Sequence, residues 1–168
     1  MAAAAFSATN RPKWLLPVVY TVAAVVMVIV GFASGMGANF QTVTRVTTPS
    51  APPSAVFSVM WAILYAVIGC AVVTQVLASK TPAHWASLAL LGATVVLAWA
   101  WPTIWSRAAA GALPGAAPVW VLGSMLLAAA PALALVPSST TAALWAPYIA
   151  WLLCALGLAL QQQARVKV

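Results

Sequence analysis

The chain has 168 residues, of which 65% are hydrophobic, and it carries seven Lys and Arg side chains but no Asp or Glu. Without carboxylates, the protein cannot use an acidic side chain as a general acid or base, as a metal ligand or as a step in a proton relay. Because a charged residue at the centre of a bilayer costs about 2.5–3.5 kcal/mol on insertion scales, this composition predicts an integral membrane protein.

The amino-terminal segment carries Arg11 and Lys13 and is followed by an apolar run over residues 14–38. This run is too long for the hydrophobic region of a secretory signal, so we expect a retained first transmembrane helix. Gly31 and Gly35 form a GxxxG motif near its end. Such a motif lets two helices approach closely in lipid, which fits either packing within the bundle or a homodimer contact.

Four more apolar segments follow, each long enough for the roughly 20 residues that a helix needs to cross a bilayer. Together with the first, they predict spans at residues 14–38, 54–78, 85–107, 115–136 and 140–162. The segments lack the alternation of apolar and polar residues that is typical of a membrane β-barrel. The predicted fold is therefore an all-α integral membrane protein, a five-transmembrane-helix bundle that forms a single domain over residues 1–168.

The positive charges do not fix the orientation in the membrane. On five spans, one side collects Arg11, Lys13 and Lys80, and the other collects Arg45, Arg107, Arg165 and Lys167. Three charges against four do not decide the topology, and the sequence does not distinguish a bacterial from an organellar membrane. The charges are scattered rather than clustered, which argues against nucleic acid as a partner and leaves membrane lipids as the expected one.

Three residues have side chains that could react or bind a metal, and we interpret all three as structural. Cys70 and Cys154 fall inside predicted spans, where cysteine packs as a small hydrophobic residue, so we favour packing over a disulfide, a haem thiolate or a redox thiol. His84 is the single histidine. Since one histidine cannot build a metal site by itself, we interpret it as a polar residue at a helix end and predict no metal site.

The nine tryptophans are more informative. Trp14 and Trp85 lie at the starts of spans, where an interfacial aromatic belt is expected. Other aromatic residues within the spans share helix faces at spacings of three or four residues, or crowd one span: Trp61 with Tyr65, Tyr148 with Trp151, and Trp99, Trp101 and Trp105. Buried indole and phenol groups need hydrogen-bond partners. We therefore expect these rings inside the bundle, either as core filling or as the wall of a pocket for a flat ligand.

Two motifs carry a resemblance to a known family. Residues 52–65 read PPSAVFSVMWAILY, a double proline followed by Phe, Trp and then Leu-Tyr, and residues 147–151 read PYIAW. In this order, in the second and fifth spans, they resemble the signatures of the TspO/translocator protein family. Trp101 falls where that family places a tryptophan in its third helix. The similarity covers nearly the whole chain.

The resemblance implies a five-helix bundle, often dimeric, with an internal cavity for porphyrins, sterols or similar flat hydrophobic molecules. Transferred position by position, the residues that would line this cavity are Phe57, Trp61, Tyr65, Trp101, Tyr148 and Trp151. Arg45 would belong to a lid over the cavity and could pair with a porphyrin propionate. No cofactor is required; the candidates for a bound molecule are a porphyrin, a chlorophyll-type tetrapyrrole, a sterol or a lipid.

The chain departs from the family pattern at the lid and inside the bundle. Thr48-Pro49-Ser50-Ala51 and Ala55 replace a Lys-Pro and tryptophans, and Ala98 and Ala159 replace asparagines. Two functions stay open: a non-enzymatic carrier or sensor with a ligand in the cavity, or a structural subunit of a larger membrane complex that contacts pigments or lipids. A channel or proton-coupled transporter is disfavoured because the spans contain no carboxylate.

Overall fold

The computed structural model describes residues 14–36 and 54–166. Within these stretches the long helices are α1 (Leu15–Gly31), α3 (Ser54–Ala78), α4 (Pro82–Ala109), α5 (Ala117–Ala134) and α6 (Ser139–Val166), and a short π-helical segment, η2 (Phe32–Met36), continues α1. All five long helices are long and apolar enough to cross a membrane, and the described residues contain no strand. The predicted all-α five-helix fold is confirmed, whereas its extent as a single domain over the whole chain stays a prediction.

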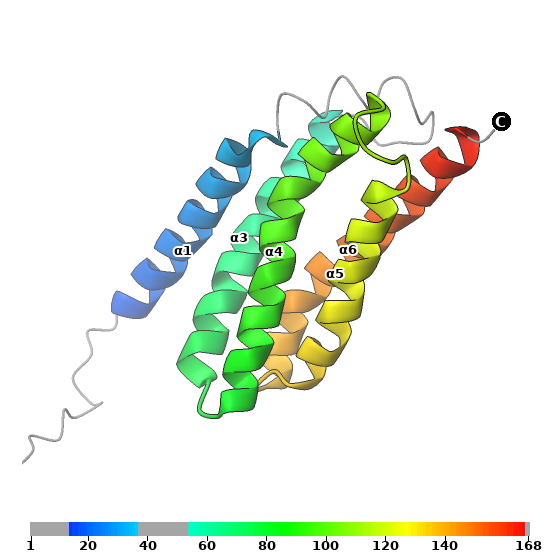
Figure 1. The fold of residues 1–168 in the computed structure, drawn as a ribbon. Coiled ribbons are helices and arrows are strands. Elements are labelled where there is room, and N and C mark those ends of the chain that lie inside the picture. Colours follow the sequence, from blue (N-terminus) through cyan, green and yellow to red (C-terminus); the bar gives the residue numbers. More distant parts are fainter. Residues whose placement is uncertain (1–13, 37–53, 167–168) are drawn as a thin grey trace, which may run out of the picture.

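The helices run side by side, with α1 at the outer edge (Figure 1). α3 contacts α1 and α6, α5 contacts α4 and α6, and η2 contacts α4. The core therefore lies among α3, α4, α5 and α6. The α3–α4 and α5–α6 connections lie at one end of the bundle, which we call the turn end, and the α4–α5 connection lies at the other (Figure 1).

At the starts of α4 and α6, side chains accept hydrogen bonds from backbone N–H groups of the first turn. The side chain of Thr81 accepts a hydrogen bond from the backbone N–H of His84 at 3.3 Å, and Pro82 occupies the first turn, where its missing N–H costs nothing. Ser138 accepts the backbone N–H of Thr141 at 3.2 Å in the same way. The predicted third span began at residue 85, and the helix begins three residues earlier because Pro82 occupies its first turn.

The first helix is peripheral. Only 6% of its 18 most apolar consecutive residues are buried, and side chains such as Val22 and Ile29 are more than half exposed. Its contact with α3 is close at Gly69, where an added Cβ would lie 2.7 Å from the backbone of Ala23. The hydroxyl groups of Tyr20 and Thr74 also lie 3.0 Å apart, within hydrogen-bonding distance. α1 is thus seated on α3, and the rest of its apolar surface faces outward.

The GxxxG motif contributes to this seating through its first glycine. Gly31 is buried, and a Cβ at this position would overlap the ring of Tyr65 on α3. The contact lies within one chain, so it accounts for this glycine by intramolecular packing. A homodimer stays a prediction. Cys70 is partly buried and Cys154 is exposed, and both are free thiols.

Candidate functional site

The predicted ligand-binding residues lie in the interior wherever the structure describes them. Arg45 falls outside the described residues. Of the other six, Phe57, Trp61, Tyr65, Trp101 and Tyr148 are at most 5% exposed, and Trp151 is partly buried against the same core. The sequence therefore placed these side chains inside the bundle correctly, while their role in binding a ligand stays a prediction.

Four of these rings form an aromatic cluster at the end of the bundle opposite the turn end. α3 presents Phe57, Trp61 and Tyr65 at intervals of four residues, so all three project from one helix face. Trp151 on α6 meets two of them edge to face, with centroid distances of 5.2 Å to Phe57 and 6.2 Å to Trp61. Trp61 stacks on Tyr65 at 5.2 Å. We call these four residues the aromatic cluster and this end of the bundle the aromatic end.

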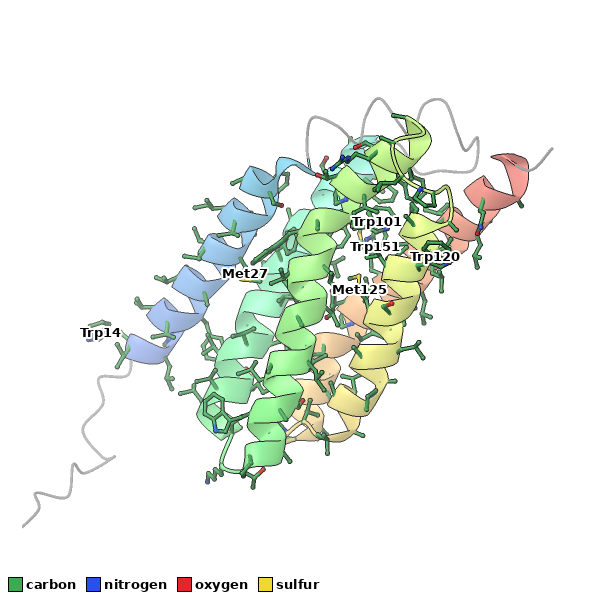
Figure 2. All side chains as sticks on the ribbon, viewed as in Figure 1. Trp14, Met27, Trp101, Trp120, Met125 and Trp151 are labelled. Carbon is green, nitrogen blue, oxygen red and sulfur yellow. The ribbon has the colours of Figure 1, made fainter. Side chains whose placement is uncertain are left out.

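A second pair of rings comes from α4. Trp101 and Trp105 meet edge to face with a centroid distance of 4.7 Å, and each is 2% exposed. Figure 2 shows Trp101 and Trp151 in the same half of the bundle, with Met125 lying further toward its middle. Trp105 was not among the predicted site residues, although its spacing of four from Trp101 is the signal that places both on one face.

The hydroxyl of Tyr148 joins two helices. It donates a hydrogen bond to Thr94 Oγ1 at 3.3 Å, and Thr94 in turn donates to the carbonyl of Leu91 at 2.7 Å. The Tyr148 ring lies tilted against Trp145, at a centroid distance of 6.2 Å. Tyr148 therefore offers the interior a ring surface, while its polar group fastens α6 to α4.

Two indole groups in this half are buried without a hydrogen bond. The Nε1 atoms of Trp99 and Trp151 have no partner among the described residues. A buried donor without an acceptor costs about 1–3 kcal/mol, so an acceptor brought to either nitrogen would be bound favourably. This half of the bundle therefore offers aromatic ring surfaces and buried indole N–H donors. It supplies no acidic group for catalysis, since the sequence contains no Asp or Glu.

The family model described as the TspO/MBR family matches residues 21–164, a range that begins within α1, ends within α6 and contains the three long helices between them. The chain belongs to the TspO/MBR family. No curated protein and no solved structure matches it. Members are generally non-enzymatic membrane proteins of binding, transport or sensing. This confirms the resemblance carried by the two motifs, and the protein is an integral, multi-pass membrane protein.

Two buried alanines lie on the same helices as the two unpaired indoles, Ala98 beside Trp99 on α4 and Ala159 with Trp151 on α6. Ala98 and Ala159, which stand where the resemblance expects asparagines, are 1% and 3% exposed. Their methyl groups fill the interior but neither donate nor accept a hydrogen bond. The unpaired polar groups of the described interior include the indole N–H donors of Trp99 and Trp151.

Proposed function

We propose that this protein binds a tetrapyrrole, a sterol or a similar flat hydrophobic molecule among the aromatic cluster and Trp101, and acts as a carrier or sensor of that ligand. The observation that supports this function best is the state of Trp151. Its ring touches two other rings of the cluster, yet its buried N–H has no partner among the described residues. A ligand acceptor at this nitrogen would offset the cost of the orphaned donor.

The physical basis of recognition is shape and stacking. Aromatic walls favour planar ring systems, and a small number of polar groups fix the orientation of the bound molecule. The cluster draws its rings from α3 and α6, and Trp101 adds one from α4. A ligand held there would contact three helices at once. Binding could therefore change how these helices pack against one another.

Fluorescence quenching tests the proposal. Purified protein is titrated with protoporphyrin, and the dissociation constant is compared with that of Trp151→Phe, which keeps a ring but removes the N–H. Loss of one buried hydrogen bond should weaken binding by about tenfold, equivalent to about 1.4 kcal/mol. Matched controls are Trp14→Phe and Trp120→Phe, because these indoles are 63% and 61% exposed and lie away from the core.

Two outcomes of the titration would contradict the proposed binding. Absence of saturable quenching would refute binding of porphyrins. An equal loss of affinity in Trp14→Phe and Trp151→Phe would place the ligand outside the aromatic cluster. Cholesterol competition for the bound porphyrin then tells whether sterols occupy the same place.

A structural subunit of a larger membrane complex is the second candidate, and the packing of the cluster favours it. The rings of Phe57, Trp61, Tyr65 and Trp151 lie against one another at 5.2–6.2 Å, so in this conformation they fill the interior themselves. Extraction in a mild detergent followed by sizing separates the two functions. A stable assembly with other proteins supports the subunit, and a discrete monomer or dimer that still binds porphyrin contradicts it.

A further inference from the structure

A buried glutamine near the turn end joins four helices. Gln75 on α3 donates from Nε2 to Ser87 Oγ at 3.1 Å and to the carbonyl of His84 at 3.4 Å, both on α4. Its Oε1 accepts the indole N–H of Trp145 on α6 at 2.9 Å. Ser87 in turn donates to the carbonyl of Ala132 on α5 at 2.7 Å. α6 is therefore joined to α3 through a side chain that is also bonded to α4.

The orientation of the Gln75 amide is fixed by its partners. Gln75, Ser87 and Trp145 are each 0% exposed. Because an indole nitrogen can only donate, the amide oxygen of Gln75 must face Trp145 and the amide nitrogen must face α4. With the amide turned over, its N–H groups would face the indole N–H, and both donors would lose their acceptors. Gln75 therefore presents one acceptor to α6, in one place.

The same two helices meet again at the aromatic cluster, where Trp151 on α6 lies edge to face against Phe57 and Trp61 on α3. Contacts between rings are only weakly directional, since they are favourable over centroid distances of about 4.5–7 Å and in more than one orientation. An N–H···O hydrogen bond is restricted to about 2.7–3.2 Å and weakens steeply when it is bent. Of these contacts, the bond at Gln75 therefore sets the tighter limit on how α6 lies against α3.

Trp145 and Trp151 are close enough along α6 for one to position the other. They are six residues apart, which is about 9 Å along a helix. Pro147 lies between them and removes one helical N–H donor, but α6 continues across it as one helix, Ser139–Val166. A rotation of α6 by one residue would turn its side chains by about 100°, and Trp151 would then leave its ring partners.

α6 has another polar contact between these two tryptophans, at Tyr148. Its hydroxyl donates to Thr94 on α4 at 3.3 Å, compared with 2.9 Å for the bond from Trp145 to Gln75. The bond from Tyr148 fixes α6 against α4 and does not reach α3. Because Phe57 and Trp61 lie on α3, the bond to Gln75 is the one that relates Trp151 to these two rings.

We propose that Gln75 is a positioning residue: through Trp145, it holds α6 in the rotation that brings Trp151 against Phe57 and Trp61. Gln75 then acts on the proposed binding site from the other end of α3, without touching the ligand. The effect on ligand binding rests on the proposed function, whereas the placement of Trp151 in the ligand-free protein does not.

Fluorine NMR of the ligand-free protein in nanodiscs tests this placement. All tryptophans are replaced by 5-fluorotryptophan, and the resonance of Trp151 is assigned by its absence from Trp151→Phe. Trp145→Phe keeps a ring and removes only the N–H that Gln75 accepts. We expect the Trp151 resonance of this variant to shift, or to split into several, at temperatures well below unfolding. Gln75→Leu removes the other partner of the bond and should have the same effect.

Two controls separate positioning from a general loss of stability. Tyr20→Phe removes the contact of a hydroxyl with Thr74, between α1 and α3, and Val76→Leu changes an exposed neighbour of Gln75. Neither variant should move the Trp151 resonance.

A protoporphyrin titration extends the test to binding. In Trp145→Phe the dissociation constant should rise about tenfold, as it should in Trp151→Phe, because the displaced indole of Trp151 no longer meets the ligand acceptor. An unchanged dissociation constant in Trp145→Phe, together with a shifted Trp151 resonance, would refute the effect of Gln75 on binding.

Three results would overturn the placement of Trp151 by Gln75. The first is an unchanged Trp151 resonance in Trp145→Phe, which decides the question even if Gln75→Leu does not fold. The second is a shift of equal size in Tyr20→Phe, because any loss of stability would then move Trp151. The third is a shift in Tyr148→Phe as large as in Trp145→Phe, since α4 would then position α6. If the resonance moves as expected but porphyrin does not bind the parent protein, the proposed function fails and the positioning by Gln75 stands.

Discussion

Single glycines decide where side chains can meet in this bundle. The ring of Tyr65 occupies the space that a Cβ of Gly31 would need, whereas the glycine at position 157 on α6 faces open space. The same residue type therefore has opposite consequences at the two positions. At Gly31 the absent side chain permits a contact between α1 and α3, and at Gly157 it only adds backbone freedom to the unfolded chain.

Gly31→Ala should lower stability and Gly157→Ala should raise it. The added methyl group at position 31 forces Tyr65 to move, which costs about 1–3 kcal/mol. At position 157 the substitution removes conformational freedom and gains about 0.5–1 kcal/mol. Thermal unfolding in detergent, followed by near-ultraviolet circular dichroism, measures both. Equal shifts in the same direction would show that the Gly31–Tyr65 contact does not constrain the fold.

Tyr148→Phe should reduce stability but leave ligand affinity intact. The hydroxyl is bonded to Thr94, and hydrogen bonds between membrane helices contribute about 0.6 kcal/mol on average and up to about 1.7 kcal/mol. The ring that would face a ligand is retained. Unfolding temperature and porphyrin titration report the two effects separately, with Tyr20→Phe as the control that loses a hydrogen bond on the outer helix. A large loss of porphyrin affinity at unchanged stability would mean that the hydroxyl binds the ligand.

At the scale of the helices, α1 differs from the other four in how it is held. α3 through α6 share the core, while α1 meets mainly α3, with Gly69 against the backbone of Ala23 and Tyr20 beside Thr74. The acyl chains of lipids are as apolar as the valine side chains of α1. Burying these side chains against α3 therefore contributes little to the free energy of association, and close packing must contribute most of it. The packing of α1 therefore depends on a surface of α3 that has no side chain at the point of closest approach.

Gly69→Ala should loosen α1 from α3. The Cβ would lie 2.7 Å from main-chain atoms of Ala23, and main chain cannot rotate away, so the two helices must move apart. Amide hydrogen exchange in α1 should accelerate, while exchange in α5 should not change. Gly92→Ala is the matched control, because nothing lies within 4 Å of a Cβ there. Exchange in α1 that is the same in both variants would contradict this account.

At the scale of the whole molecule, the bundle has two unlike ends. Paired polar side chains close the turn end around Gln75, and aromatic rings fill the other around Trp151. No side-chain carboxylate takes part in either, because the chain has none, and its formal net charge is +7. The interior is consequently organised by hydrogen bonds between neutral groups and by ring packing.

Stability should be independent of pH between about pH 5 and pH 3, the range in which Asp and Glu side chains bind protons. Stability changes with pH only where the folded and unfolded states bind different numbers of protons. In this range neither state has side-chain carboxylates to protonate, so the usual acid-induced loss of stability has no source. Unfolding temperatures in a non-ionic detergent measure this. A fall centred near pH 4 would contradict it.

The class of the protein, and the burial of its aromatic rings within the core, could be read from the sequence. Apolar stretches of sufficient length and the lack of acids require membrane helices, and the motifs around Trp61 and Trp151 indicated the family. Which polar groups pair with one another could be seen only in the folded protein, since hydrogen bonds between Gln75, Ser87 and Trp145 join residues up to 70 positions apart. The same holds for the hydrogen bond from the Tyr148 hydroxyl to Thr94 and for the packing of the Tyr65 ring against Gly31. Local patterns fix which face of a helix is apolar, but the partner of each buried group depends on how the helices are rotated and placed against one another.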